Sequence, residues 1–133
     1  YSEIVFTTGK HMKLSQVQQL LDAKILTGQE YIDESVDEAC GCDLMSDVLR
    51  YAKENGVLLT GLVNIQVLNT ADMANMHSIV FVRNKQPTSQ ILDMADDIGM
   101  LVMQTSLPMF QACGILYQNG LRGAKPKEDP NGL

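Results

Sequence analysis

Three short runs of almost purely apolar residues constrain the fold most strongly. They are Val57–Thr60 (VLLT), Ile79–Val82 (IVFV) and Met100–Met103 (MLVM). A strand that is covered on both faces reads as such a run, whereas a strand with one wet face alternates apolar and polar residues. The three runs therefore predict three strands in the middle of a buried sheet.

The segments between and after these runs have the period of a helix. In each of the first two, apolar residues recur at offsets 0, 1, 4 and 7, which places them on one helical face. Pro87 and Thr88 are expected to begin the second helix and Gly99 to end it, while Ser106 is expected to cap a third helix that Gly120 ends. The apolar positions are Val67, Leu68, Ala71 and Ala74, then Ile91, Leu92, Ala95 and Ile98, then Met109, Ala112, Cys113 and Leu116.

Strands that alternate with helices at this spacing predict successive βαβ units. Each crossover is expected to be right-handed, and neighbouring strands are expected to be parallel. The predicted fold class is therefore α/β, a single domain of three-layer type around a parallel sheet.

The first half of the domain has weaker signals. Ser15-Gln16-Val17-Gln18 has the form of a capping box ahead of a helix. Lys24–Gly28 and Val36–Asp43 are predicted to form short strands. Asp43 is expected to cap a further helix, with Gly56 as its left-handed terminal residue. The apolar side of that helix is expected to be Met45, Val48, Leu49 and Ala52.

The two ends of the chain are expected to lie outside the domain, which we place at residues 12–121. Tyr1–His11 has no helical period and ends in the His-Met pair of a common cloning site, so it reads as a vector remnant. A short native strand at Glu3–Thr7 is the alternative. Arg122–Leu133, rich in Pro, Gly and charge, is expected to be a mobile tail.

Charge and cysteine content narrow the choice of partners. The net charge of −6 opposes binding to nucleic acid, and no apolar run approaches a membrane span. Three cysteines, Cys40, Cys42 and Cys113, do not make a disulfide framework. Reduced thiols and a cytoplasmic location are therefore expected.

No complete catalytic motif is present, so the chain is not expected to be an enzyme or to need a cofactor. Gly9-Lys10 resembles the end of a P-loop, but Ile4 replaces its first glycine and His11 its Ser or Thr. His77, at a helix-to-strand junction, is expected to be solvated or capping rather than a base. A nucleophile elbow of the Gly-x-Ser-x-Gly type is absent.

One candidate binding site follows from topology. Ligands of open α/β sheets bind beyond the carboxyl ends of the strands, which here means Thr60–Asn64, Arg83–Gln86 and Gln104–Ser106. Two cations in such a place suit a phosphate or another anion, although surface Arg and Lys beside a turn are also commonplace. The candidate ligand-binding residues are Thr60, Gly61, Asn64, Arg83, Asn84, Lys85 and Thr105.

Cys40-Gly41-Cys42 is a weaker candidate for metal or redox chemistry. Side chains at i and i+2 of a strand share a face, and Cys113 would supply a third thiolate. The alternative is two small buried thiols, with Cys113 in the core stripe of its helix. The acidic groups Asp33, Glu34, Asp37 and Glu38, and Asp93, Asp96 and Asp97, lack the spacing of a divalent-ion site and read as solvated.

Four segments together resemble the DRTGG domain family. They are Asp43–Leu49 (DLMSDVL), Leu58–Asn64 (LLTGLVN), Val80–Pro87 (VFVRNKQP) and Phe110–Tyr117 (FQACGILY). The resemblance spans residues 12–121 and implies an α/β fold similar to the N-terminal domain of HPr kinase/phosphorylase. The chain departs from the name-giving motif: its positions fall on Val63, Asn64 and Ile65 and near Val82, Arg83 and Asn84, while Thr60 and Gly61 are retained.

The resemblance implies a regulatory or dimerisation role. Stand-alone DRTGG proteins similar to this chain resemble proteins that are encoded beside iron hydrogenase genes in anaerobes, which implies a regulatory or accessory role there. The first hypothesis is therefore a non-catalytic module that forms a homodimer. The resemblance implies that this module is an accessory to iron hydrogenase or energy metabolism, with a protein partner in an enzyme complex. The second is a sensor of a nucleotide or another anion, and the third is a cysteine-based redox or metal accessory. Met73, Met76 and Met109 are candidates for an adaptable contact surface, with core packing as their alternative use.

Overall fold

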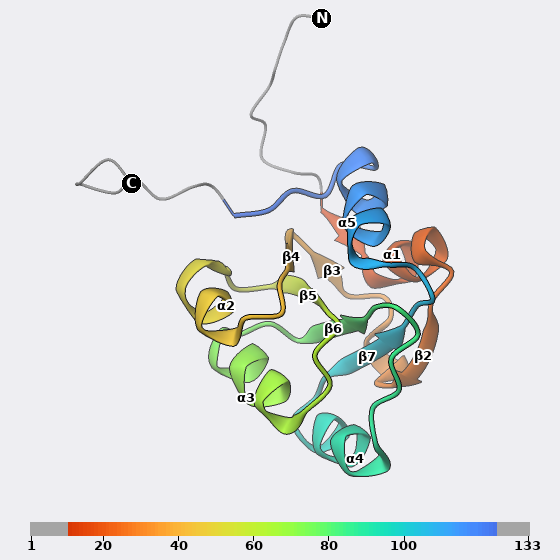
Figure 1. The fold of residues 1–133 in the computed structure, drawn as a ribbon. Helices are drawn as coiled ribbons and strands as arrows, with labels where there is room; N and C mark the ends of the chain where they lie inside the picture. The colour runs from red at the N-terminus through yellow and green to blue at the C-terminus, as the bar shows by residue number, and fades with distance from the viewer. Residues whose placement is uncertain (1–10, 125–133) are drawn as a thin grey trace, which may run out of the picture.

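The structure is a computed structural model that describes residues 11–124, and in it a five-stranded sheet lies between two layers of helices (Figure 1). The strand order is β2-β7-β6-β5-β4. The last four are parallel to one another, and β2 is antiparallel to β7. The strands are β2 (Lys24–Thr27), β4 (Glu38–Gly41), β5 (Gly56–Thr60), β6 (Ser78–Phe81) and β7 (Leu101–Gln104).

The three apolar runs form adjacent parallel strands, as predicted. Leu58 of β5 pairs with Ile79 of β6, which in turn pairs with Val102 of β7. All residues of these three strands are buried. The α/β class and the parallel core are therefore confirmed.

The helices cover the two faces of the sheet unequally. Figure 1 shows α1 and α5 on one side, with α2, α3 and α4 on the other. Their bounds are α1 (Leu14–Leu21), α2 (Met45–Tyr51), α3 (Ile65–Met73), α4 (Ser89–Asp97) and α5 (Met109–Gln118), and a short 3₁₀ turn, η1, spans Gln29–Tyr31.

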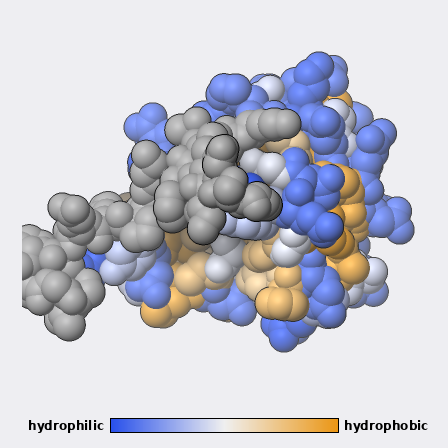
Figure 2. Space-filling view, turned by 90° about the horizontal axis from the view of Figure 1, so that it is seen from above, coloured by the Kyte–Doolittle hydropathy of each residue, from blue (hydrophilic) through white to orange (hydrophobic). Residues whose placement is uncertain are grey.

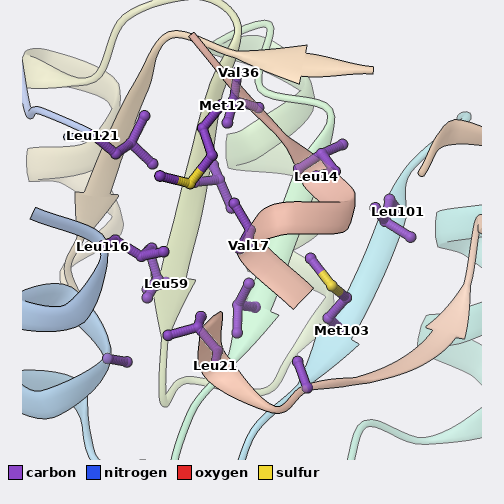
Figure 3. Packing of buried hydrophobic residues seen from close by; sticks show 14 of the residues in the cluster. Met12, Leu14, Val17, Leu21, Val36, Leu59, Leu101, Met103, Leu116 and Leu121 are labelled. Carbon is purple, nitrogen blue, oxygen red and sulfur yellow. The ribbon is translucent and has the colours of Figure 1, made fainter. Parts of the chain in front are cut away.

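The two faces carry separate apolar cores. On the α1 and α5 side, Val17 and Leu21 meet Leu59 of the sheet and Leu116 of α5 (Figure 3). On the other side, Leu58 and Phe81 pack beneath α2, α3 and α4. Each fully buried side chain of this kind contributes roughly 1.5–3 kcal/mol, so the strand pattern alone specifies much of the core.

One short pairing was not predicted, and one predicted strand is divided in two. β1 (Met12–Lys13) pairs antiparallel with β3 (Ser35–Val36), and the predicted strand 36–43 is divided into β3 and β4. Two-residue strands are too short to show a period. The antiparallel edge strand β2 falls within the predicted strand 24–28, whose end at Gly28 is confirmed by a φ of +86°.

The predicted N-caps of three helices were wrong: Ser15 for α1, Asp43 for α2 and Ser106 for α5. Another residue is the N-cap in each case. In α1 the cap is Lys13, whose N–H donates to Oε1 of Gln16 at 3.0 Å. The N–H groups of Leu14 and Ser15 donate to backbone carbonyls of residues 34 and 32, so Ser15 is not needed as a cap. In α5 the cap is Pro108 rather than Ser106.

The predicted caps of α2 were wrong at both ends. Leu44 is the N-cap, while the Asp43 carboxylate turns toward the end of β5. At the other end Asn55 takes the left-handed conformation, with φ +60°, and Gly56 begins β5. The start of α4 at Thr88 is confirmed, since its hydroxyl accepts from the N–H of Ile91 at 3.3 Å. Gly99 and Gly120 are left-handed at the ends of α4 and α5, as predicted.

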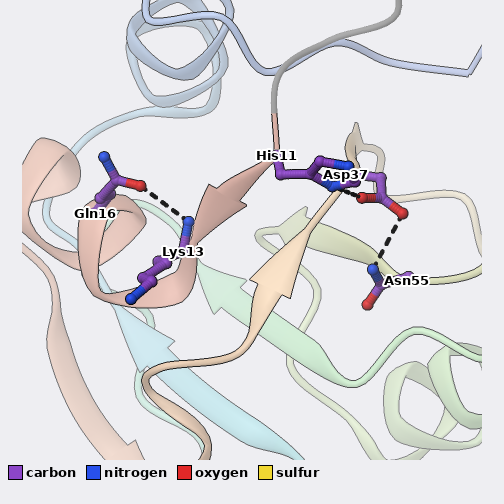
Figure 4. A network of polar contacts seen from close by, with 5 residues as sticks. All are labelled: His11, Lys13, Gln16, Asp37 and Asn55. Carbon is purple, nitrogen blue, oxygen red and sulfur yellow. Dashed lines mark hydrogen bonds and ion pairs between the residues drawn. The ribbon is translucent and has the colours of Figure 1, made fainter.

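The described chain begins and ends with contacts to the sheet. His11 forms an ion pair with Asp37, which also accepts from Asn55 at 3.1 Å (Figure 4). At the other end, the carbonyl of Arg122 accepts from the N–H of Ala39 at 3.0 Å, so the tail expected from residue 122 is paired there with β4. The alternative strand at Glu3–Thr7 lies outside the described residues, as does most of the predicted vector remnant. None of the helices in residues 11–124 has the length and hydropathy that a bilayer span requires.

Candidate functional site

The carboxyl ends of β5, β6 and β7 meet at one edge of the sheet, as the topology predicted. The N–H of Val82 donates to the carbonyl of Thr60 at 3.0 Å. The N–H groups of Arg83 and Asn84 donate to the carbonyls of Leu107 and Thr105, at 2.9 and 2.8 Å. Backbone hydrogen bonds therefore hold the three loops side by side.

The structure also places Asp43 at this edge, where the sequence pattern did not predict it. Its Oδ1 accepts from the hydroxyl of Thr60 and from the N–H of Gly61, both at 2.8 Å. The Gly61 N–H holds the pKa of Asp43 below its usual range, with further lowering from the Thr60 hydroxyl and the Arg83 charge, against the opposing effect of burial. A carboxylate at a strand end could have been noticed in the sequence, but it was interpreted as a helix cap.

Arg83 crosses the end of β5 and lies against Gly61. A β-carbon at Gly61 would be 2.5 Å from Nη2 of Arg83. Arg83 and Asn84 both have left-handed backbones, with φ of 56° and 59°, which is uncommon for consecutive residues other than glycine. The turn leaves the side chains of Arg83, Asn84 and Lys85 exposed.

The two threonines of the predicted site have structural roles. Thr105 is buried, and its hydroxyl donates to the carbonyl of Leu21 at 2.7 Å and accepts from the N–H of Leu107 at 3.2 Å. Thr60 is buried beside Asp43. Asn64 caps α3 by accepting from the N–H of Val67 at 3.2 Å. Of the predicted residues, the exposed groups are thus the cations Arg83 and Lys85, with Asn84 between them.

The structure does not assemble the three-thiolate site. Cys40 and Cys42 pack with the core on the α2 side of the sheet, whereas Cys113 packs on the α5 side, where its Sγ lies 3.7 Å from Sδ of Met109. Burial, followed by the neighbouring Cys42, raises the pKa of Cys40 to about 11, and burial also raises the pKa of Cys113. Protonated thiols are weak nucleophiles and must lose a proton to bind metal.

The remaining candidate groups lie apart from one another. Within residues 11–124 no three His, Cys, Asp or Glu side chains converge as metal ligands. Asp96 accepts from the hydroxyl of Thr27 at 3.4 Å, and His77 is exposed at the start of β6. Among the methionines, Met76 is buried, Met109 is partly buried and Met73 is exposed.

Two hollows that the sequence did not predict flank the edge strand β4. One, of about 150 Å³, lies between β4 and the end of α2, and its wall includes Glu38, Cys40 and Ala52. The other, of about 270 Å³, lies on the α5 side, with Gly41 and Cys113 in its wall. Both lie along the strand rather than in the loops at the carboxyl edge.

Comparison with known proteins identifies a shared fold. The chain is similar to the regulatory region of a Clostridium perfringens pyrophosphatase, comprising CBS and DRTGG domains, whose structure was solved with its activator diadenosine tetraphosphate. The TM-score is 0.67 at 12% identity, over 88% of this chain and 51% of that one, so the chain spans about half the length of that region. No protein-family model and no curated protein matches the chain. A DRTGG-like fold is thereby supported, and the similar region is a regulatory one.

Proposed function

We propose that the chain is a non-catalytic regulatory module that acts through self-association, with α5 as the contact between two copies. The observation that carries the proposal is the outer face of α5. Phe110 is 86% exposed and Tyr117 is 59% exposed. The two lie seven residues apart, on one side of the helix, with the exposed Gly114 between them.

A second copy of the chain suits this face on electrostatic grounds. Residues 107–121 contain no charged side chain, although the chain carries a net charge of −6. The guanidinium of Arg122 lies over the Tyr117 ring, 4.0 Å from its centroid, so this face carries a cation and no carboxylate of α5. Two copies of an acidic chain repel one another less across such a face than across an acidic one. Figure 2 shows the side of the molecule that lies uppermost in Figure 1, where apolar residues are exposed in separate patches among hydrophilic ones. A two-fold axis would place Phe110 of each copy against the other helix, as in an isologous dimer.

Sedimentation velocity on wild type and on a Phe110→Asp variant tests this assignment. We expect wild type to sediment as a dimer at high micromolar concentration and Phe110→Asp as a monomer, because the substitution would bury an unpaired charge. Leu49→Asp, at an exposed apolar position of α2, is the matched control and is expected to remain dimeric. A wild-type monomer at 1 mM, or dissociation by both variants alike, would contradict the proposal.

Sensing of a nucleotide or another anion is the second candidate, favoured by the exposed Arg83 and Lys85 at the carboxyl edge. The guanidinium has five donors suited to a phosphate, and its position over Gly61 keeps it near the backbone of that loop. The similar pyrophosphatase region was solved with a dinucleotide activator. Asp43 opposes the anion, because its carboxylate stays ionised beside Arg83.

A thermal-shift titration separates this candidate from simple self-association. Diadenosine tetraphosphate or ATP at 1 mM is expected to raise the melting temperature of wild type, since a ligand of the native state stabilises it. Arg83→Ala should remove most of the rise, and Lys13→Ala, a surface cation elsewhere, should not. An unchanged melting temperature of wild type would retire the candidate.

Two further parts of the proposal rest on the family resemblance and the thiols. A role beside iron hydrogenase, or in energy metabolism with a protein partner, is expected to show as co-purification under anaerobic conditions. A reducing, cytoplasmic setting accords with the three unpaired cysteines Cys40, Cys42 and Cys113. Because Cys113 lies on the other face of the sheet, a redox role would involve Cys40 and Cys42 alone. A metal-free protein after anaerobic purification would exclude a metal-binding role.

A further inference from the structure

We infer that the hollow between β4 and α2 is a binding site for a compact amine: an apolar body of about one ring that carries an ammonium group for Glu38. The inference does not depend on self-association. The site lies where Glu38 and Gly56 pair, at the amino ends of β4 and β5. It is therefore at the opposite end of these strands from Arg83.

The polar wall of the hollow has an unsatisfied acceptor. Oε2 of Glu38 is buried and has no hydrogen-bond partner among residues 11–124. Glu38 shares a strand face with Cys40, two residues on, which places its side chain on the α2 side with the hollow. A buried acceptor without a donor is costly, and more so when the group is charged. The terminal torsion of Glu is broad, so a small rotation would bring this oxygen to a donor in the hollow.

The size and the remaining walls set the body of the ligand. About 150 Å³ is the size of cavity that holds benzene in an engineered protein core. Ala52 and Met76 are apolar, and the Cys40 thiol, with its pKa raised to about 11, is neutral. Tyr51 lies at the rim and is 44% exposed. The guanidinium of Arg50 lies over its ring, 5.2 Å from the centroid, so the attraction for a ligand cation is assigned to Glu38 and not to this ring.

The charges of the wall favour a cation over an anion. Lys53 also borders the hollow, but its side chain is exposed and is therefore screened by solvent. The buried oxygen of Glu38 is screened much less. The net charge of −6 adds to the attraction for a cation.

Amide NMR titrations of the full chain with benzylamine, benzyl alcohol and benzoate test the site. Benzylamine is expected to give saturable shifts at Cys40, Ala52 and Gly56 by 10 mM. Benzyl alcohol should bind at least ten-fold more weakly, and benzoate should leave these amides unshifted. The expected affinity for benzylamine falls at least ten-fold in Glu38→Gln and is unchanged in Glu34→Gln, which alters an exposed carboxylate elsewhere.

A second variant keeps the test decisive if Glu38→Gln disturbs β4. Ala52→Leu should fill the hollow and abolish the benzylamine shifts while the remainder of the spectrum stays that of wild type. The inference is overturned if benzylamine causes no saturable shift, if its shifts lie elsewhere, if benzoate matches it, or if folded Glu38→Gln binds as tightly as wild type.

Discussion

Asp43 shows how one side chain can organise a loop. Its carboxylate joins the end of β5 to the start of α2 through the Thr60 hydroxyl and the Gly61 N–H. Hydrogen bonds to a charged acceptor contribute roughly 1.5–3 kcal/mol. The position of Arg83 over Gly61 depends on the same loop, so Asp43 helps to place Arg83 even though its charge opposes an anion there.

Acid should weaken the native state through Asp43. Because the folded pKa of this carboxyl lies below its unfolded value, its contribution is complete above the unfolded pKa of about 4 and is lost as pH falls through the folded pKa. Because Asp43 is exposed and solvent screens its interactions, Asp43→Ala is expected to lower the free energy of unfolding at pH 7 by only about 1 kcal/mol. The variant should also flatten its decline between pH 5 and pH 2. Urea denaturation at several pH values measures both effects, and an unchanged decline in the variant would refute the assignment.

Gly41 is required by a contact across elements. A β-carbon there would lie 2.5 Å from Sγ of Cys113 and 3.2 Å from Sδ of Met109. Overpacking of this kind costs about 1–3 kcal/mol. We therefore attribute the glycine between the two cysteines to packing against α5 rather than to metal binding.

A double-mutant cycle tests this attribution. Gly41→Ala is expected to destabilise the protein by about 1–3 kcal/mol, and adding Cys113→Ala should recover most of the loss, because the new methyl takes the place of the sulfur. Chemical denaturation of the four proteins gives the coupling energy. Additive effects of the two substitutions would contradict the contact.

At the level of elements, Thr105 ties α1 to the sheet. The Leu21 carbonyl at the end of α1 receives the Thr105 hydroxyl, which follows β7. The two residues are 84 positions apart in the chain, so this bond is made only when the layers pack. Ser106, the predicted cap of α5, is exposed beside it and is not the cap.

These neighbours should therefore respond differently to the same substitution. Thr105→Ala is expected to lower the free energy of unfolding by about 1–3 kcal/mol, because it leaves the Leu21 carbonyl without its donor in a buried place. Ser106→Ala should change it by less than about 0.5 kcal/mol, as at ordinary surface positions. Urea denaturation measures the free energy of unfolding of both variants. Equal losses would contradict a specific stabilising role for the hydrogen bond from Thr105 to Leu21.

At the scale of the whole molecule, the net charge opposes the self-association that we propose for α5. Copies with a net charge of −6 repel, and salt screens that repulsion. The proposed contact is centred on the exposed Phe110 and Tyr117, with the Arg122 guanidinium over the Tyr117 ring. The stabilisation that comes from burying its apolar surface is not lost through screening.

Salt should therefore promote self-association. Raising NaCl from 50 to 500 mM is expected to lower the dimer dissociation constant several-fold, because the Debye length shortens from more than 10 Å to less than 5 Å. Sedimentation equilibrium at both salt concentrations measures the constant. Weaker association at high salt would indicate an interface of ion pairs and would exclude the α5 face.

The sequence by itself determined the sheet core and its class. The sequence specifies buried strands locally through the apolar runs at Val57–Thr60, Ile79–Val82 and Met100–Met103. A strand that is buried on both faces has almost no position for a polar side chain. The sequence also placed Arg83 and Lys85 at the carboxyl edge correctly, because parallel strands end together. The left-handed glycines Gly99 and Gly120 were local signals as well.

Tertiary structure decided which polar groups meet. Asp43 and Ser106 had the residue types of caps, but the packed layers offered Asp43 the donors of Thr60 and Gly61 and began α5 at Pro108. The edge strand β2 and the hollow beside Glu38 likewise depend on segments far apart in the chain. A polar atom bonds to whichever partner folding brings within about 3 Å, and no local pattern contains that information.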